Sequence, residues 1–281
     1  MTAISASMVK ELREMTGAAM MDCKKALTEC AGSMEDAKEF LRKKGQTIAN
    51  KKSSRETKEG AICIKNEGQK AALVKVACET DFVAINDDFL GFINKIAAQS
   101  IEVEGKDLMN QTTSGGAIKE QFIEAISKLG ENIVFVDGEY WNADKNSAIG
   151  SYTHSNGKIG VMVEIGADEL KQKDQVQNLA RDLAMHIAAS QVEAIATSDL
   201  DPAVIDKERT FLIQQAQDSG KPQNIIEKMV EGRLKKFQKE ICLLEQNFVK
   251  NPEKSINQVV NDLGKEIGSS LQVKRYYKST F

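Results

Sequence analysis

Apolar side chains recur every three or four positions in the first part of the chain and alternate with polar ones from about residue 61. Three short segments within residues 1–45 show the first spacing, and glycines separate them. This pattern predicts three helices, of which the first begins at Ser5 or Ser7 and the third at Ser33. We expect a three-helix bundle over residues 1–45 that is too small to be very stable alone.

Residues 46–60 interrupt this pattern with a stretch rich in lysine, serine and glycine. We interpret the segment as a basic linker. Its positive charges could also contact RNA, but a charge run of this length is more often a solvated connector, and we favour that interpretation.

A core subdomain is predicted over residues 61–140. Short apolar runs flank a turn at Asn66–Gly68, which predicts a β-hairpin, and apolar residues at helical spacing then predict a helix packed on it. A further strand is expected at 132–136, before an acidic turn at Asp137-Gly138. The hairpin connections are too short for parallel crossovers, so we expect an α+β protein with mainly antiparallel sheets.

A second core subdomain repeats this arrangement over residues 141–200 and 242–281. A strand is followed by the turn pair Asn156-Gly157, a second strand and an amphipathic helix. We therefore expect two related subdomains produced by duplication. The two predicted helices even end in similar segments, Lys95–Gln99 and His186–Ser190.

Residues 201–241 lie between the two pieces of the second subdomain and predict two helices separated by Ser219–Pro222. Their apolar stripes are narrow and their flanks are charged, so we expect an inserted helical (coiled-coil) hairpin that projects from the body. The exposed apolar positions could pair within the hairpin, with a second copy of the chain or with a partner, which leaves a homodimer open.

Composition narrows the range of functions. The chain has 38 lysines and arginines against 41 aspartates and glutamates, so no basic field attracts nucleic acid or an anionic membrane. The five cysteines show no Cys-x-x-Cys spacing, the amino terminus lacks the pattern of a secretory leader, and no apolar run reaches membrane-spanning length. We expect a cytoplasmic protein whose partners are proteins or small molecules.

Residue patterns typical of enzymes are mostly missing. There are two histidines and no His-Glu-x-x-His, Gly-x-Ser-x-Gly or paired-cysteine motif. The pair Gly157-Lys158 does not fit a phosphate loop, because Gly150 lies too far back and Ile159 stands where a serine or threonine should hold magnesium. We therefore predict no catalytic residue, no metal, no cofactor and no direct nucleotide binding.

The turn Thr80–Val83 carries an informative pair of side chains, Asp81 and Phe82, directly after an apolar strand. A carboxylate beside an exposed phenylalanine suits insertion into another macromolecule better than holding a small substrate. The alternative is a helix-capping Asp81 and a buried Phe82 ring. Asn86–Asp88 offer caps closer to the next helix, which weakens this alternative for Asp81.

Two methionines and two histidines also need an interpretation. Met20 and Met21 are neighbours, and adjacent helical positions lie about 100° apart, so one is expected to pack in the bundle while both cannot easily face inward. His154 lies beside a hairpin turn, where an ordinary exposed residue and a partner contact are equally supported. His186 is expected to be a half-buried packing residue.

Several specific segments are shared with a known family. They are Thr16-Gly17 through Met20–Leu27, Thr80–Ala84, Gly150–Tyr152 with His154, Met185–Ala189, and Ser219–Pro222 with Glu227–Arg233. On these segments the chain resembles the bacterial elongation factor Ts family, the nucleotide-exchange factors for elongation factor Tu in translation elongation. The resemblance covers essentially the whole chain.

The resemblance implies a ubiquitin-associated-like fold for the amino-terminal bundle and a role for each candidate residue. Several relatives continue past the final strand into an additional carboxy-terminal module that touches the partner, so we expect that contact to be absent here and the affinity to be lower. The turn Thr80, Asp81, Phe82 and Val83 would enter the GTPase domain of elongation factor Tu and disturb its magnesium coordination, while Met20, Met21 and His154 would help the surfaces dock.

Two alternatives come from other functional classes. An adaptor of ubiquitin-associated type would bind a helix or a protein tail without affecting nucleotide. A small-molecule enzyme is weakly supported, because the ionisable groups form no recognisable set. Acceleration of GDP release from elongation factor Tu would distinguish the exchange factor from the adaptor.

Overall fold

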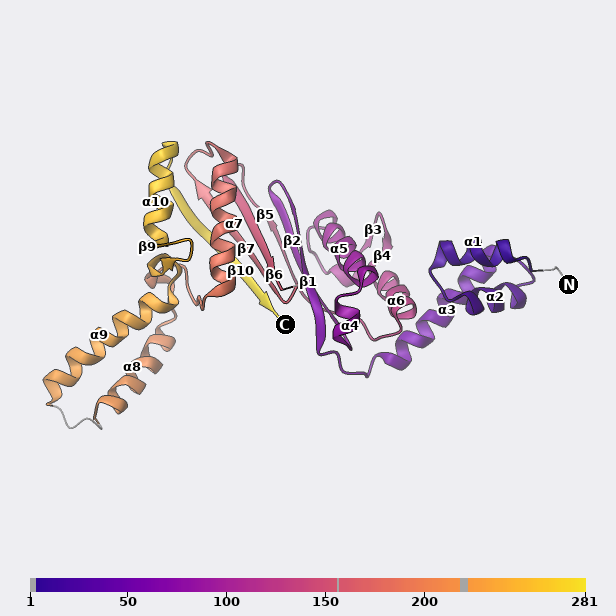
Figure 1. The fold of residues 1–281 in the computed structure, drawn as a ribbon, viewed down its shortest axis with the longest axis horizontal. Helices are drawn as coiled ribbons and strands as arrows, with labels where there is room; N and C mark the ends of the chain where they lie inside the picture. Colours follow the sequence, from indigo (N-terminus) through magenta and orange to yellow (C-terminus); the bar gives the residue numbers. More distant parts are fainter. Residues whose placement is uncertain (1–3, 156, 218–221) are drawn as a thin grey trace. The chain divides into compact units, whose positions relative to one another are not determined.

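The computed structural model describes residues 4–155, 157–217 and 222–281. The chain divides into two compact units, each of which combines helices with small sheets, and this confirms the predicted α+β class (Figure 1). The first unit comprises Met1–Asn142, Thr153–Gly160 and Ser279–Phe281, and the second comprises Ala143–Tyr152 and Val161–Lys278.

The first unit opens with the three predicted helices, α1 (Ala6–Thr16), α2 (Met20–Glu29) and α3 (Met34–Lys52). Serine side chains begin two of them, because the hydroxyl groups of Ser5 and Ser33 accept hydrogen bonds from backbone N–H groups of the first helical turn. Six buried residues fill the space between the helices: Val9, Leu12, Cys23, Ala26, Leu27 and Ala37.

The third helix is longer than predicted. It continues past Gly45 to Lys52, so the first part of the expected linker 46–60 is helical and the linker assignment was wrong there. The reason is packing: a Cβ atom on Gly45 would lie 3.4 Å from the side chain of Ile123 in α6 (Ile118–Leu129). Glycine therefore allows two helices to approach closely, and this contact outweighs its low helix propensity.

A three-stranded antiparallel sheet follows in the order β1-β2-β5, with β1 (Glu59–Glu67), β2 (Lys70–Cys78) and β5 (Val134–Asn142). The predicted hairpin and the helix after it are confirmed, and that helix is α5 (Asp87–Glu102). The buried core between the sheet and α5 and α6 includes Val74, Val76, Phe89, Ile93, Ile96, Phe122 and Ile126.

The acidic turn expected at Asp137-Gly138 is not a turn. Both residues lie inside β5, where Asp137 pairs with Lys75 and Gly138 with Val74 next to a shift in register between Lys75 and Val76. A β-bulge places an extra residue in the strand, and Gly138 fits where a Cβ atom would lie 2.8 Å from a ring carbon of Phe135. A local glycine signal was therefore misread as the end of the strand.

The second unit contains the core of the other predicted copy. Its sheet has the order β10-β7-β6, with β6 (Ser147–His154), β7 (Ile159–Ala167) and β10 (Leu271–Thr280). The helices α7 (Lys173–Ala189) and α10 (Ile256–Ile267) accompany it. Asn156, the first residue of the predicted turn pair, lies outside the described residues.

Shorter elements complete the two copies. They are α4 (Asp81–Ala84), the 3-10 helices η1 (Leu108–Asn110), η2 (Thr197–Asp199) and η3 (Leu243–Glu245), and the strands β3 (Thr112–Thr113), β4 (Gly116–Ala117), β8 (Asn247–Phe248) and β9 (Asn251–Ser255). With these, the order β1-β2-α5-β3-β4-α6-β5 in the first copy matches β6-β7-α7-β8-β9-α10-β10 in the second. In each copy the last strand pairs with the second strand of the hairpin. This order is what a duplication would produce.

Two long helices stand between α7 and β8 in the second copy and have no counterpart in the first. They are α8 (Pro202–Gln217) and α9 (Gln223–Ile241), as predicted, although Ser219–Lys221 of the expected break lie outside the described residues. Five buried residues pair them: Leu212, Ala216, Ile226, Val230 and Leu234. No helix in the described part of the chain has the length and apolar character needed to cross a membrane.

Candidate functional site

The turn after β2 is a single helical turn with a defined start. Thr80 is the N-cap of α4, and its hydroxyl oxygen accepts a hydrogen bond from the backbone N–H of Val83 at 3.4 Å. The side chain of Asn86 then accepts from the N–H of Asp88 at 2.8 Å and begins α5. Asp81 is the N-cap of neither helix, but its carboxylate accepts a hydrogen bond from the N–H of Phe82 at 3.0 Å in the first turn of α4, so the capping alternative holds in part.

The four residues of α4 divide between solvent and core. The Phe82 side chain is 79% exposed, so the alternative of a buried ring is wrong. Asp81 is also exposed, whereas Ala84 is buried and Val83 packs partly against the core of the first unit. Successive helical positions point about 100° apart, and this one turn thus presents Asp81 and Phe82 outward while anchoring the other two residues.

Glu131, in the segment after α6, holds the base of this turn. Its carboxylate accepts hydrogen bonds from the backbone N–H groups of Glu79 and Thr80, at 3.0 and 3.1 Å, and from the Thr80 hydroxyl at 2.6 Å. Charge-assisted hydrogen bonds of this kind are stronger than neutral ones. Sequence reasoning missed Glu131, because nothing in local spacing connects it with a turn about fifty residues earlier.

A further hydrogen bond runs from the segment after α6 to the segment after β2, with Glu79 as the acceptor. The Glu79 carboxylate accepts from the backbone N–H of Asn132 at 2.7 Å and lies 3.4 Å from the Arg55 guanidinium. The Asn132 side chain donates to the Arg55 carbonyl at 2.9 Å. The Lys52 ammonium donates to the Gly130 carbonyl at 2.5 Å. Two basic residues of the expected linker thus contact the protein itself.

Cys78 at the end of β2 shows no sign of activation. It is fully buried and its thiol donates to the Thr80 carbonyl at 3.2 Å. Burial, with a smaller contribution from the Glu131 carboxylate, raises the pKa of the Cys78 thiol to about 12. A protonated thiol is a poor nucleophile, so this group supports the turn rather than chemistry.

The methionine pair lies at the start of α2, and both side chains face solvent. Met20 is 58% exposed and Met21 is 70% exposed. The expectation that one of them fills the bundle was wrong, because Cys23, Ala26 and Leu27 of the same helix already occupy its interior. The start of α2 thus carries two large flexible apolar side chains in solvent.

The two histidines differ in burial. His154, at the end of β6, is exposed, and its carbonyl accepts from the N–H of Lys158 at 3.1 Å. His186 is 3% exposed, more buried than predicted. Its Nδ1 accepts from the N–H of Val249 at 3.2 Å, so Nε2 carries the proton and donates to the Gln246 side chain at 2.7 Å. Burial lowers the pKa of His186.

The candidate residues therefore lie on three segments: the turn at α4, the start of α2 and the end of β6. The turn brings four of them together, while the methionine pair and His154 belong to separate elements. Within the described ranges no cluster of three or more histidine, cysteine, aspartate or glutamate side chains is arranged to hold a metal ion.

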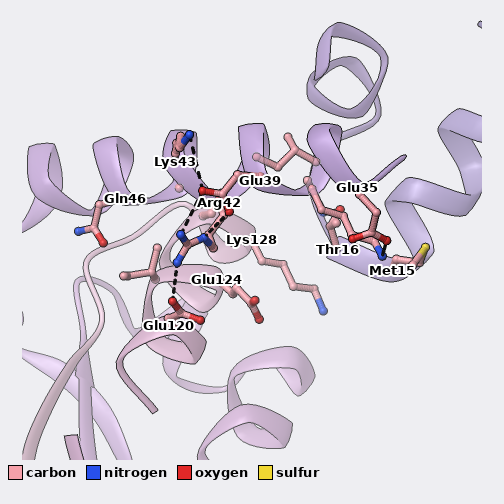
Figure 2. Close-up of a pocket in the computed structure, with 17 residues that line it drawn as sticks. Met15, Thr16, Glu35, Glu39, Arg42, Lys43, Gln46, Glu120, Glu124 and Lys128 are labelled. Atoms are coloured by element: carbon pink, nitrogen blue, oxygen red, sulfur yellow. Dashed lines mark hydrogen bonds and ion pairs between the residues drawn. The ribbon is translucent and has the colours of Figure 1, made fainter. Parts of the chain in front are cut away.

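A cavity of about 500 Å³ lies elsewhere in the first unit, beside α3 and α6 (Figure 2). Its lining includes none of the candidate residues. Arg42 of α3 contacts Glu39 at 2.7 Å and Glu120 of α6 at 2.6 Å, and the hydrogen bond from Arg42 lowers the pKa of Glu39. Burial raises the pKa of Glu124 in the same wall. The Arg42–Glu120 ion pair joins the two helices, whereas the Arg42–Glu39 pair lies within α3.

Comparison with known proteins gives a consistent result. The family model described as elongation factor TS matches residues 79–277. The elongation factor Ts of Hydrogenovibrio crunogenus is 46% identical over 287 residues, a match that covers 97% of this chain and 94% of that protein. The proteins of the same name from Clostridium novyi and Aquifex aeolicus are each 42% identical and cover 98% of this chain, with 92% and 96% of their own lengths matched.

The turn presents an exposed aromatic side chain on a hydrogen-bonded base, an arrangement typical of protein-binding surfaces. The chain belongs to the elongation factor Ts family. Membership supports a role in translation elongation as a nucleotide-exchange factor for elongation factor Tu, which is not a catalyst of covalent chemistry.

Proposed function

We propose that this chain promotes GDP release by inserting the turn Thr80–Val83 into the GTPase domain of elongation factor Tu. The observation that carries the proposal is the exposure of Phe82, 79%, on a turn whose base is held by hydrogen bonds on both sides. A large apolar side chain held in water by a fixed backbone loses little conformational entropy on binding and gains from burial.

The partner's nucleotide site explains why insertion would release GDP. Bound phosphates are held by backbone N–H groups, and magnesium requires near-ideal octahedral oxygen ligands. Displacing the backbone that supports these ligands weakens both. In this account Phe82 supplies the apolar contact that shifts the partner's backbone, while the Asp81 carboxylate repels or competes with groups near the phosphates. This chain binds the protein and not the nucleotide.

Thermodynamic linkage sets a further requirement. If the chain weakens nucleotide binding by some factor, nucleotide must weaken binding of the chain by the same factor, and each tenfold corresponds to about 1.4 kcal/mol. The chain therefore binds strongly to the nucleotide-free partner and is released when GTP enters. This cycle lets one molecule act on many partners.

We assign docking roles to the other exposed candidates. Met20 and Met21 place two adaptable apolar side chains on the surface of the bundle, and His154 adds a polar group at a strand end. Such residues suit recognition of a second protein surface, since methionine adapts its shape and histidine can donate or accept. In this account they contribute to affinity, whereas the turn drives release.

The test is a stopped-flow measurement of labelled GDP leaving elongation factor Tu. Phe82→Ala is expected to lower the accelerated rate by about thirtyfold, the loss typical of truncating a residue at the centre of an interface. Phe211→Ala is the matched control, because Phe211 is also an exposed phenylalanine, at 56%, but lies on α8. The control should keep most of the acceleration.

If the unmodified chain failed to accelerate release, the exchange proposal would be lost. The adaptor alternative would then lead, because exposed Met20 and Met21 still offer a surface for a helix or a protein tail. Equal losses in the two phenylalanine variants would reject the special role of the turn while leaving exchange itself intact.

A further inference from the structure

We propose that Glu131 is a positioning residue for exchange: its carboxylate fixes the orientation in which α4 presents Phe82. The proposal rests on the exchange function proposed above, but its structural part can be tested without the partner. Glu131 is half-buried beneath the turn, outside the Thr80–Val83 segment, and it accepts three hydrogen bonds from Glu79 and Thr80.

The Thr80 hydroxyl connects Glu131 to α4. A hydroxyl has one hydrogen to donate, and here that hydrogen points to the Glu131 carboxylate at 2.6 Å. The oxygen lone pairs are then free to accept the N–H of Val83, which begins the single turn of α4. Glu131 thus fixes the hydroxyl in the direction that caps the helix.

The backbone contacts act on the same turn. At the end of β2 the N–H groups of Glu79 and Thr80 donate hydrogen bonds to the Glu131 carboxylate instead of to a neighbouring strand. Unpaired N–H groups at this place would favour other backbone conformations that satisfy them. One carboxylate therefore sets both the exit of the strand and the start of the helix.

Glu131 is itself held in place from two sides. It follows Gly130, which ends α6 in the left-handed conformation at φ 76° and whose carbonyl accepts from Lys52. On the other side, Asn132 donates its N–H to the Glu79 carboxylate. The segment after α6 and the segment after β2 thus each supply a carboxylate that accepts N–H groups of the other.

The chain contains a matched control for this arrangement. Glu102 accepts from the backbone N–H and from the hydroxyl of Ser114, at 2.7 and 2.8 Å, in a different loop of the same unit. Glu131→Gln and Glu102→Gln therefore remove the same charge from the same kind of contact. Only the first change affects the turn that carries Phe82.

Hydrogen–deuterium exchange of the free protein tests the structural part. In Glu131→Gln the amides of residues 79–84 are expected to exchange about tenfold faster, because a weakened base lets the turn open more often. In Glu102→Gln the same amides should keep their rates. Unchanged exchange at 79–84 in Glu131→Gln would overturn the proposal.

GDP release from elongation factor Tu tests the functional part. At saturating concentration Glu131→Gln is expected to lower the release rate by about tenfold, whereas Glu102→Gln leaves it unchanged. In the Phe82→Ala background the further loss caused by Glu131→Gln should shrink to about twofold, since the two residues act through the same turn. Independent, multiplicative losses would overturn the positioning role.

Two results keep this test separate from the exchange proposal. If the unmodified chain does not accelerate release, exchange fails, yet faster amide exchange in Glu131→Gln still supports the structural part. If Glu131→Gln does not fold, judged by circular dichroism, Glu131→Asp takes its place, because aspartate keeps the charge but shortens the side chain by one methylene. Faster amide exchange at 79–84 together with slower GDP release is expected, and fast amide exchange with unchanged release would overturn the proposal.

Discussion

The same place in the two copies of the core is built in two different ways. In the first copy the strand β2 leads through Glu79 and Thr80 into α4 with its exposed Phe82. In the second copy β7 leads through Asp168 and Glu169 directly toward α7, without a helical turn between them. The fold therefore does not require an exposed aromatic side chain at this position.

The supports beneath the two connections occupy corresponding positions but differ in chemistry. In the first copy Glu131, one residue after the glycine that ends α6, accepts from Glu79 and Thr80. In the second copy the segment after the glycine that ends α10 supplies neutral groups. The Ser269 hydroxyl accepts from the N–H of Glu169 at 3.1 Å, and the Ser270 carbonyl accepts from the N–H of Asp168 at 3.2 Å.

This difference shows that the carboxylate is not a constant part of the repeat, which is consistent with the positioning role proposed for Glu131. A carbonyl and a hydroxyl satisfy the two N–H groups after β7, so a charge is not needed to close such a connection. The charged support occurs beneath the turn that carries the exposed Phe82. The second connection instead carries an ion pair between Glu169 and Lys171 at 3.2 Å.

The largest expected effect on GDP release comes from placing a charge on the connection of the first copy. The same change in the connection of the second copy is the control. Phe82→Glu should lower the accelerated GDP release by about a hundredfold, because the inserted side chain would carry a charge into an apolar contact. Leu170→Glu, in the connection of the second copy, should leave release within about twofold of the unmodified chain. Stopped-flow release with both variants checks this, and equal losses would break the comparison.

A second expectation concerns the packing of the second copy. A Cβ atom on Gly150 of β6 would lie 2.1 Å from the backbone nitrogen of Arg181 and 2.3 Å from the carbonyl carbon of Ala180 in α7. Gly150→Ala should therefore lower the free energy of unfolding by about 2 kcal/mol or more, the usual cost of overpacking. Thermal unfolding measures the loss. Gly232→Ala is the control, because a Cβ there meets nothing within 4 Å.

The smallest expected effect is a pH dependence confined to the second copy. His186 is held neutral, since its Nδ1 accepts a backbone N–H and burial lowers its pKa. Below about pH 6.5 the unfolded chain takes up this proton first, so the stability contribution of neutral His186 is lost as the pH falls, by up to about 1.4 kcal/mol per pH unit.

Denaturant unfolding between pH 7.5 and 5.5 would measure this slope. His186→Gln cannot take up the proton, so its curve should be flatter over the same range. The sign would be wrong if the unmodified protein became more stable on acidification through that range while the variant did not.

Hydrophobic spacing predicted most elements of both copies, because each helix and strand buries one face on its own core. It failed where a distant contact overrode a local signal. Gly45 suggested the end of a helix but allows α3 to pack against Ile123, and Gly138 suggested a turn but lies at a bulge in β5. Ile123, which Gly45 meets, and Val74, which pairs with Gly138, both lie more than sixty residues away in the sequence.

Prediction of the candidate site from the sequence also failed where distant contacts decide the structure. The exposure of Phe82 followed from an apolar residue in a short polar connection, and the structure confirms it. One methionine of the pair at 20 and 21 is expected from the sequence to be buried, but both are exposed. Other residues of α2 already fill the bundle. Glu131 could not be found at all from local pattern, since its link to Thr80 exists only in the folded chain.

The most direct measurement of the central claim is GDP release from elongation factor Tu with and without this chain, at millimolar free magnesium and after chelation. If the turn acts by disturbing magnesium and phosphate contacts, acceleration should be large with magnesium present and shrink about tenfold once the metal is removed, because little is then left to disturb. No acceleration at all, or the same acceleration factor in both conditions, would contradict the account.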